Sequence, residues 1–138
     1  MEYINRKTHP NRIERQKMKI IVTGTRGIPG IQGGVETHCE ELFPRIADEK
    51  HEVIVIRRPE YKSVEYGVSK YKGVTIKDIK TLPGKHFEAI THTFIAVLYA
   101  RKIHADIVHI HAIGPSLMIP IVRILGMKAV MTHHGPDY

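Results

Sequence analysis

The sequence has one cysteine, no tryptophan and no apolar segment long enough to cross a membrane. Because Cys39 is alone, no internal disulfide can form, and such a cysteine is typical of reducing compartments. The longest apolar runs, residues 94–100 and 117–122, fall well short of the roughly 18 residues that a transmembrane helix needs. The chain also opens without the charged and then apolar segment of a secretory signal. We therefore expect a cytoplasmic protein.

Acidic residues are too few to balance the basic ones, but the excess is concentrated at one end of the chain. The formal charge is +7, and residues 1–19 contribute +4 of it through six basic and two acidic side chains. Only +3 remains for the other 119 residues, so nothing favours a nucleic-acid-binding face. We expect a solvated basic tail or upstream extension at residues 1–17 and one domain at 18–138. A basic tail attracts anionic lipids, so peripheral contact with the inner face of the membrane stays open.

Strand and helix patterns alternate along the domain. Apolar runs typical of buried strands occupy residues 18–23, 52–56, 74–79, 107–111 and 128–132. Apolar residues recur at helical spacing over 35–46 and 87–98, and Pro44 predicts a kink or an early end in the first helix. A short third helix is expected over 114–126, because proline is tolerated in a first turn. The polar stretch 61–72 predicts a loop. This alternation builds βαβ units, so we expect an α/β fold, a Rossmann-like doubly wound parallel sheet. Such sheets usually continue beyond a fifth strand, so we expect a truncated domain.

A glycine-rich loop follows the first expected strand. Residues 24–34 contain five glycines, and Gly33 and Gly34 directly precede the first helix. The leading N–H groups of a helix lack internal partners and favour an anion, and glycine lets a phosphate approach the backbone. In a doubly wound sheet this loop faces the end of a neighbouring strand, here residues 111–114, across a crevice. The alternative reading is a flexible turn with a helix cap.

Two named phosphate motifs bear on this loop. The Walker A pattern is absent, which counts against a P-loop NTPase. Residues 24–30 form G-x-x-G-x-x-G, which resembles the loop of the extended short-chain dehydrogenases and sugar-nucleotide epimerases. Tyr66 and Lys70 match that family's Tyr-x-x-x-Lys string, although its pair belongs on a later helix. Arg57 and Arg58 replace the acid that holds a ribose and would fit only a 2′-phosphate. An NADP-dependent reductase or epimerase is therefore the alternative function, and a non-catalytic nucleotide-binding module is a third.

A longer pattern covers residues 18–138. Its parts, in order, are 33–38 (GGVETH), 51–53 (HEV), 106–111 (DIVHIH) and 132–135 (THHG). This pattern resembles the N-terminal domain of family 4 glycosyltransferases, retaining enzymes with the two-domain GT-B fold. The segment 25–30 (TRGIPG) is similar to the branch that includes proteins classed as rhamnosyltransferases. Lys50 departs from the glycine that the family often has before its His-Glu-Val strand.

The resemblance implies a function and its partners. The reaction would move a sugar from a nucleotide-sugar donor to the hydroxyl of a glycan or lipid-linked acceptor, with retained configuration, in polysaccharide or glycan biosynthesis. No cofactor and no metal are implied. The family's E-x7-E donor motif lies in a C-terminal domain that is missing here, so we expect this fragment alone to be inactive. It would supply the acceptor side and the loop for the donor phosphates.

The resemblance also implies roles for single residues. Gly33 and Gly34 would approach the donor diphosphate, and His111 would add to the donor site. His134 matches a histidine that contacts the donor sugar near the reacting centre, and it is the catalytic candidate. The acceptor side would be bordered by Arg26, Glu36 and His38.

Two other features admit competing interpretations. His109 and His111 are two residues apart on an expected strand, so their side chains point to the same face. They could ligate zinc, but a zinc site needs three or four ligands, and hydrogen-bonded histidines of the core or the crevice are the favoured reading. The apolar run 94–100 fits either core packing of a helix or a membrane-contact stripe, with packing favoured.

Overall fold

The computed structural model describes residues 17–48, 51–61, 70–82, 84 and 87–135. Its centre is a six-stranded sheet in the order β3-β4-β2-β1-β5-β6. The strands are β1 (Lys19–Thr23), β2 (Glu52–Arg57), β3 (Lys70–Tyr71), β4 (Val74–Asp78), β5 (Ile107–His111) and β6 (Lys128–Thr132). All neighbouring pairs are parallel except β3 and β4, which are antiparallel. The expected Rossmann-like α/β fold is therefore confirmed.

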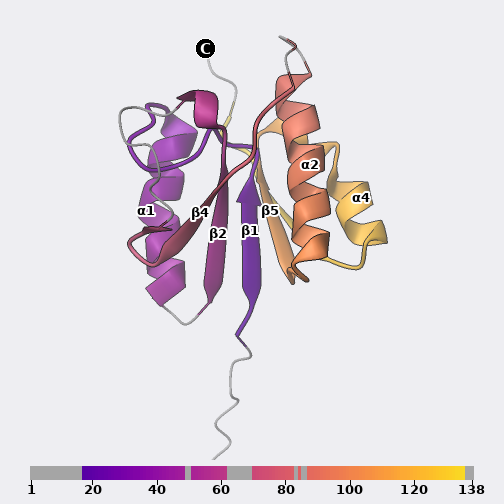
Figure 1. Cartoon of the computed structure of the whole chain (residues 1–138), viewed down its shortest axis with the longest axis horizontal. Coiled ribbons are helices and arrows are strands. Elements are labelled where there is room, and N and C mark those ends of the chain that lie inside the picture. The colour runs from indigo at the N-terminus through magenta and orange to yellow at the C-terminus, as the bar shows by residue number, and fades with distance from the viewer. Residues whose placement is uncertain (1–16, 49–50, 62–69, 83, 85–86, 136–138) are drawn as a thin grey trace, which may run out of the picture.

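Helices cover both faces of the sheet. They are α1 (Gly34–Asp48), α2 (Glu88–Lys102), α3 (Ile113–Ser116) and α4 (Ile119–Ile124), with a short 3₁₀ helix η1 (Pro59–Tyr61). Figure 1 shows α1 on one side of the strands and α2 with α4 on the other. Of the expected basic tail, only Lys17 lies within the described residues.

The strand alternation divides the core into two parts. Ile21, Ile54 and Ile110 belong to a cluster that packs against α2 and α4. Their strand neighbours Val22 and Val55 belong to a second cluster with Cys39 and Phe43 of α1. Successive strand residues point to opposite faces, so each central strand contributes to both clusters. This pattern explains why the central strands read as continuous apolar runs.

The strand order reverses direction beside β1. This strand pairs with β2 on one side and with β5 on the other, with Val22 opposite both Val55 and His109. The loop after β1 and the segment after β5 therefore lie at the same edge of the sheet, where the sequence predicted that they face each other. In open α/β sheets, ligands bind at such a reversal, beyond the carboxyl ends of the strands.

Three local expectations need correction. Of the two outcomes expected at Pro44, a kink or an early end, the early end is wrong: α1 runs on to Asp48, because the buried Cys39 and Phe43 anchor it on the sheet. The stretch 61–72 is not all loop, since Lys70–Tyr71 pairs with β4 as a short edge strand. A strand of two residues is too short to produce a recognisable apolar pattern. The single helix expected over 114–126 is divided into α3 and α4. Of the dehydrogenase string that the alternative reading used, Tyr66 lies outside the described residues, whereas Lys70 belongs to β3.

The apolar run 94–100 serves core packing. Ala96, Val97 and Ala100 of α2 are buried in the cluster beneath it, whereas Phe94 and Leu98 remain partly exposed. Within the described ranges, no helix combines the length and the hydropathy that crossing a bilayer would require.

Candidate functional site

A cleft of about 600 Å³ opens at the carboxyl edge of the sheet, at the reversal beside β1. The loop after β1, the start of α1, the segment after β5 and the segment after β6 all contribute to it. Its lining residues are Gly24, Arg26, Gly33, Gly34, Val35, Glu36, His38, Arg58, Ala89, Ala112, Pro115 and His134. Six of the seven residues predicted from the sequence therefore meet in one cleft, and the seventh, His111, lies behind it.

Gly24 and Gly34 differ in whether the fold requires a glycine at their positions. Gly24 has a φ of +86°, and a Cβ there would overlap the carbonyl oxygen of His111. Glycine is therefore required where the β1 loop crosses the end of β5. Gly34 has neither constraint: a Cβ on it would meet nothing within 4 Å. The missing side chain of Gly34 leaves open space at the N-terminus of α1.

Glu36 holds the loop against α1. Its Oε1 accepts hydrogen bonds from the Thr25 hydroxyl at 3.0 Å and from the Arg26 N–H at 2.9 Å. The side chain is nearly enclosed, with 5% of the residue exposed. A Cβ on Gly33 would overlap the other carboxylate oxygen, so Gly33 makes room for this contact. The carboxylate predicted to border the acceptor thus also fixes the loop's shape.

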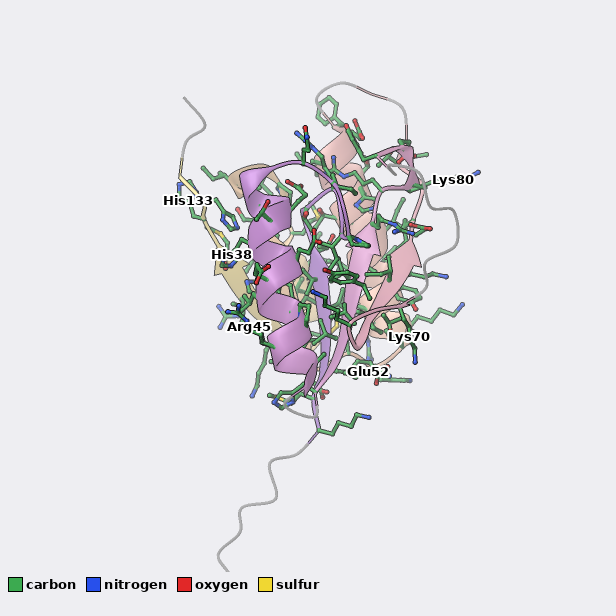
Figure 2. The ribbon with its side chains drawn as sticks, turned by 90° about the vertical axis from the view of Figure 1, so that its left-hand side faces the viewer. His38, Arg45, Glu52, Lys70, Lys80 and His133 are labelled. Atoms are coloured by element: carbon green, nitrogen blue, oxygen red, sulfur yellow. The ribbon has the colours of Figure 1, made fainter. Side chains whose placement is uncertain are left out.

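Four histidines gather beside the helix start. The rings of His109 and His111 stack at 4.4 Å between centroids, which confirms that both point to the same face of the sheet. His111 Nδ1 lies 2.9 Å from His134 Nε2, and the ring of His134 packs edge-on against that of His38. Figure 2 shows His38 on α1, on the same side of the molecule as His133, the residue before His134.

Burial sets the protonation of His111 and Cys39. Burial first, and then the neighbouring imidazoles of His109, His134 and His38, together lower the pKa of His111 to about 3. Burial also raises the pKa of the Cys39 thiol to about 12, with the charge of Glu36 adding to the effect. At neutral pH, His111 is therefore an uncharged imidazole and Cys39 is a protonated thiol.

Two proton assignments of opposite direction satisfy the contacts among Cys39, His111 and His134, and in one of them the thiol is the first donor. Cys39 Sγ lies 3.7 Å from His111 Nε2, so the thiol can donate to that nitrogen. The ring proton of His111 is then on Nδ1 and is donated to His134 Nε2. His134 consequently carries its own proton on Nδ1. His111 thus orients the imidazole of His134, which is exposed at the cleft.

The alternative chemistries find less support. Among the residues that the structure describes, no three side chains of His, Cys, Asp or Glu are arranged to hold a metal. The Arg57 guanidinium, a candidate for a 2′-phosphate, is buried and donates to both carboxylate oxygens of Asp78, at 2.7 and 3.2 Å. Arg57 thus supports the sheet, whereas Arg58 lines the cleft.

Some lining residues escaped the sequence analysis. Ala112, directly after β5, has a φ of +76°, a conformation that alanine rarely adopts and that nothing in its sequence context signals. From the sequence, Arg58 is considered only together with Arg57, as a pair that would fit a 2′-phosphate. Its place directly after β2, at the carboxyl edge, was the signal that could have assigned it to the cleft.

The chain was compared with known proteins. A search of curated protein sequences found no significant match. The family model of Glycosyltransferase Family 4 matches residues 32–138, most of the chain and nearly every element that forms the cleft. With a Rossmann-like sheet of the kind that forms half of a GT-B enzyme, the chain belongs to Glycosyltransferase Family 4, and its function is of the glycosyltransferase type.

Proposed function

We propose that this chain is the N-terminal half of a retaining GT-B glycosyltransferase. It would move a sugar from a nucleotide-sugar donor to a hydroxyl of a glycan or lipid-linked acceptor, in polysaccharide or glycan biosynthesis. The observation that carries the proposal is the cleft in which the start of α1 and His134 meet. A C-terminal domain with the family's donor motif would close over this cleft. The retained configuration and a cytoplasmic location rest on the family resemblance and on composition.

The start of α1 supports a site for the donor diphosphate. Helix α1 has 15 residues, and the first N–H groups of a helix have no partners within it. The macrodipole adds a partial positive charge at the same end. Because Gly34 leaves open space there, a phosphate can approach these N–H groups closely. Such donors stabilise the negative charge that develops on a leaving diphosphate.

His134 supports contact with the transferred sugar. Its ring is held by His111 on one nitrogen, and the described residues leave the other nitrogen to act in the cleft. An imidazole nitrogen can donate or accept a hydrogen bond with a sugar hydroxyl. The acceptor would lie on the side of Arg26, Glu36 and His38. His111 itself would act on the donor through His134.

The proposal is tested by titrating the chain with UDP and GDP while its amide signals are followed by NMR. We expect signals of Gly34 and Val35 to shift, and Gly34→Ala to weaken the response about tenfold, because the new methyl group occupies the phosphate's space. Gly114→Ala is the matched control, since a Cβ at Gly114 also meets nothing within 4 Å and Gly114 is not a lining residue.

Two outcomes contradict the proposal. The first is the absence of any response at Gly34 and Val35 to millimolar nucleoside diphosphate. The second is saturable micromolar binding of NADPH, which would favour the reductase or epimerase. In the complete enzyme, release of nucleoside diphosphate from a panel of nucleotide-sugars identifies the donor.

A further inference from the structure

Arg26 and Arg58 line the cleft, and the ring of Tyr61 contacts both of their guanidinium groups. These three residues form what we call the cationic corner. We propose that this corner binds an oxyanion carried by the acceptor, a phosphate or a carboxylate group. The inference rests on the proposed function in one respect: it takes this side of the cleft as the acceptor side. The binding of the oxyanion itself can be tested without any donor.

Backbone hydrogen bonds bring the three residues together from separate segments. The Arg58 N–H donates to the carbonyl of Arg26 at 2.9 Å, which ties the β1 loop to the end of β2. The Tyr61 N–H donates to the carbonyl of Arg58 at 3.1 Å and closes η1. The two guanidinium carbons lie 5.3 Å (Arg26) and 6.0 Å (Arg58) from the centre of the Tyr61 ring. Contact with one ring restricts both cations and lowers the entropy that binding would cost.

The charge of this corner is poorly balanced. In the described part of the chain, Arg26 forms no ion pair, and its guanidinium donates only to the Gln32 carbonyl at 3.3 Å. The Arg58 side chain is 9% exposed, yet its one ion pair among those residues is a long 3.7 Å contact between Nη1 and Glu88 Oε1. The Arg58 Nε is buried and has no hydrogen-bond partner there. A buried guanidinium with so few partners is stabilised by a further anion.

The neighbouring charges are engaged elsewhere. The carboxylate of Glu36 binds the Thr25 hydroxyl and the Arg26 N–H, and that of Glu60 accepts two hydrogen bonds from Thr81. Arg57 pairs with Asp78. The two guanidinium groups thus remain available to a ligand that enters the cleft, and their planar donor arrays match phosphate and carboxylate oxygens.

The corner differs from the proposed donor site in place and in chemistry. Donor phosphates would use the backbone N–H groups at Gly33 and Gly34, at the start of α1. The corner instead uses side chains from the β1 loop and from the end of β2. An acceptor that is a sugar phosphate or a uronic acid would therefore be preferred to a neutral glycan.

The test uses the full chain and three probes that share a sugar ring: glucose 6-phosphate, glucuronate and the neutral methyl glucoside. Binding is followed by NMR at the Arg58 Nε–H and at the Tyr61 amide. We expect both signals to shift with one or both anions and neither to shift with the methyl glucoside. The stronger of the two anions identifies the oxyanion. Arg58→Gln and Arg26→Gln should each weaken its binding about tenfold or more, the usual effect of removing a charge-assisted hydrogen bond.

Control variants separate the corner from general charge. Arg45→Gln removes an arginine of α1 that is exposed and paired with Glu41, and it should leave binding unchanged. Figure 2 shows Arg45 further along α1 than His38. Arg58→Lys keeps the charge but not the planar donors, and it should bind with intermediate affinity. If Arg58→Gln fails to fold, the exposed Arg26 still provides the test.

The inference is overturned if the methyl glucoside binds as well as the anions, or if neither arginine variant weakens binding. It is also overturned if the anions shift Gly34 and not Tyr61, although the proposed donor site would then stand. If UDP leaves Gly34 unshifted while anions shift Tyr61, the oxyanion site stands and the donor part of the proposed function fails.

Discussion

The two faces of the sheet are built from the same strands but differ in what they contain. In β5, Val108 and Ile110 face α2 and α4 and join an apolar cluster, while the alternate residues His109 and His111 face α1. On the α1 face, the apolar packing around Phe43 gives way to imidazoles, Glu36 and Thr25 as the strands approach the cleft. One strand therefore contributes stability through one set of residues and site chemistry through the other.

The largest expected effect on stability comes from a residue on the sheet face that packs against α2 and α4. Ile110→Ala removes a fully buried side chain, so it should lower the free energy of unfolding by about 2–5 kcal/mol. Urea denaturation measures the loss. In the fraction that remains folded, the response of Gly34 to UDP should be unchanged. A folded Ile110→Ala protein that no longer responds to UDP would show that the two faces are not independent.

The opposite result is expected for His134. His134→Ala in the complete enzyme should lower kcat/KM by about 10- to 1,000-fold, as loss of one polar contact near a reacting centre does. Its melting temperature should fall by only a few degrees, because the side chain is exposed and the main loss is the hydrogen bond to the buried His111. His133→Ala is the matched control: this exposed neighbour interacts with the Gly135 N–H and is not a lining residue. Equal and small effects on turnover would remove His134 from the site.

We expect the free energy of unfolding to depend on pH, because His111 is a buried residue of the α1 face as well as the partner of His134. The unfolded chain takes up a proton below its ordinary pKa of 6.5, whereas the folded pKa is about 3. Stability is therefore fully present above pH 6.5 and is lost as the pH falls from 6.5 toward 3. By linkage, this group alone accounts for about 2 kcal/mol between pH 7 and pH 5.

His111→Asn measures that contribution in urea titrations at the two pH values, and it should reduce the loss without abolishing it. Burial also lowers the pKa of His92, to about 4, and that of His109, so both act in the same direction. An undiminished loss in His111→Asn would show that His111 is not the buried neutral group of the α1 face.

The smallest expected effect is at Ala112, where β5 leaves the sheet. Its φ of +76° and ψ of +156° are readily available only to glycine. Ala112→Gly removes strain of about 1–3 kcal/mol and adds roughly 0.5–1 kcal/mol of unfolded-chain entropy. We expect a net gain of about 1 kcal/mol in the free energy of unfolding, measured with urea. A loss would mean that the backbone at this lining residue is not strained.

The sequence predicted the central strands and the cleft because both depend on local patterns. Apolar runs identified β1, β2 and β5, and the glycines before α1 identified the edge where the cleft forms. It did not predict that α1 continues through Pro44, because the packing of Cys39 and Phe43 on the sheet comes from distant residues. The corner of Arg26, Arg58 and Tyr61 was equally hidden, because Arg26 reaches the other two residues only when the β1 loop packs against the end of β2. The roles of the predicted site residues stay predictions.

The contact between Gly24 and the carbonyl of His111 has a consequence for how specificity can diverge. A side chain at Gly24 would overlap the backbone of His111, so none can be added at that point without separating β1 from β5. The width at the base of the cleft is therefore set by the pairing of β1 with β5. Selection for a new substrate would have to act on the rim, at residues such as Arg26, Arg58 and His38.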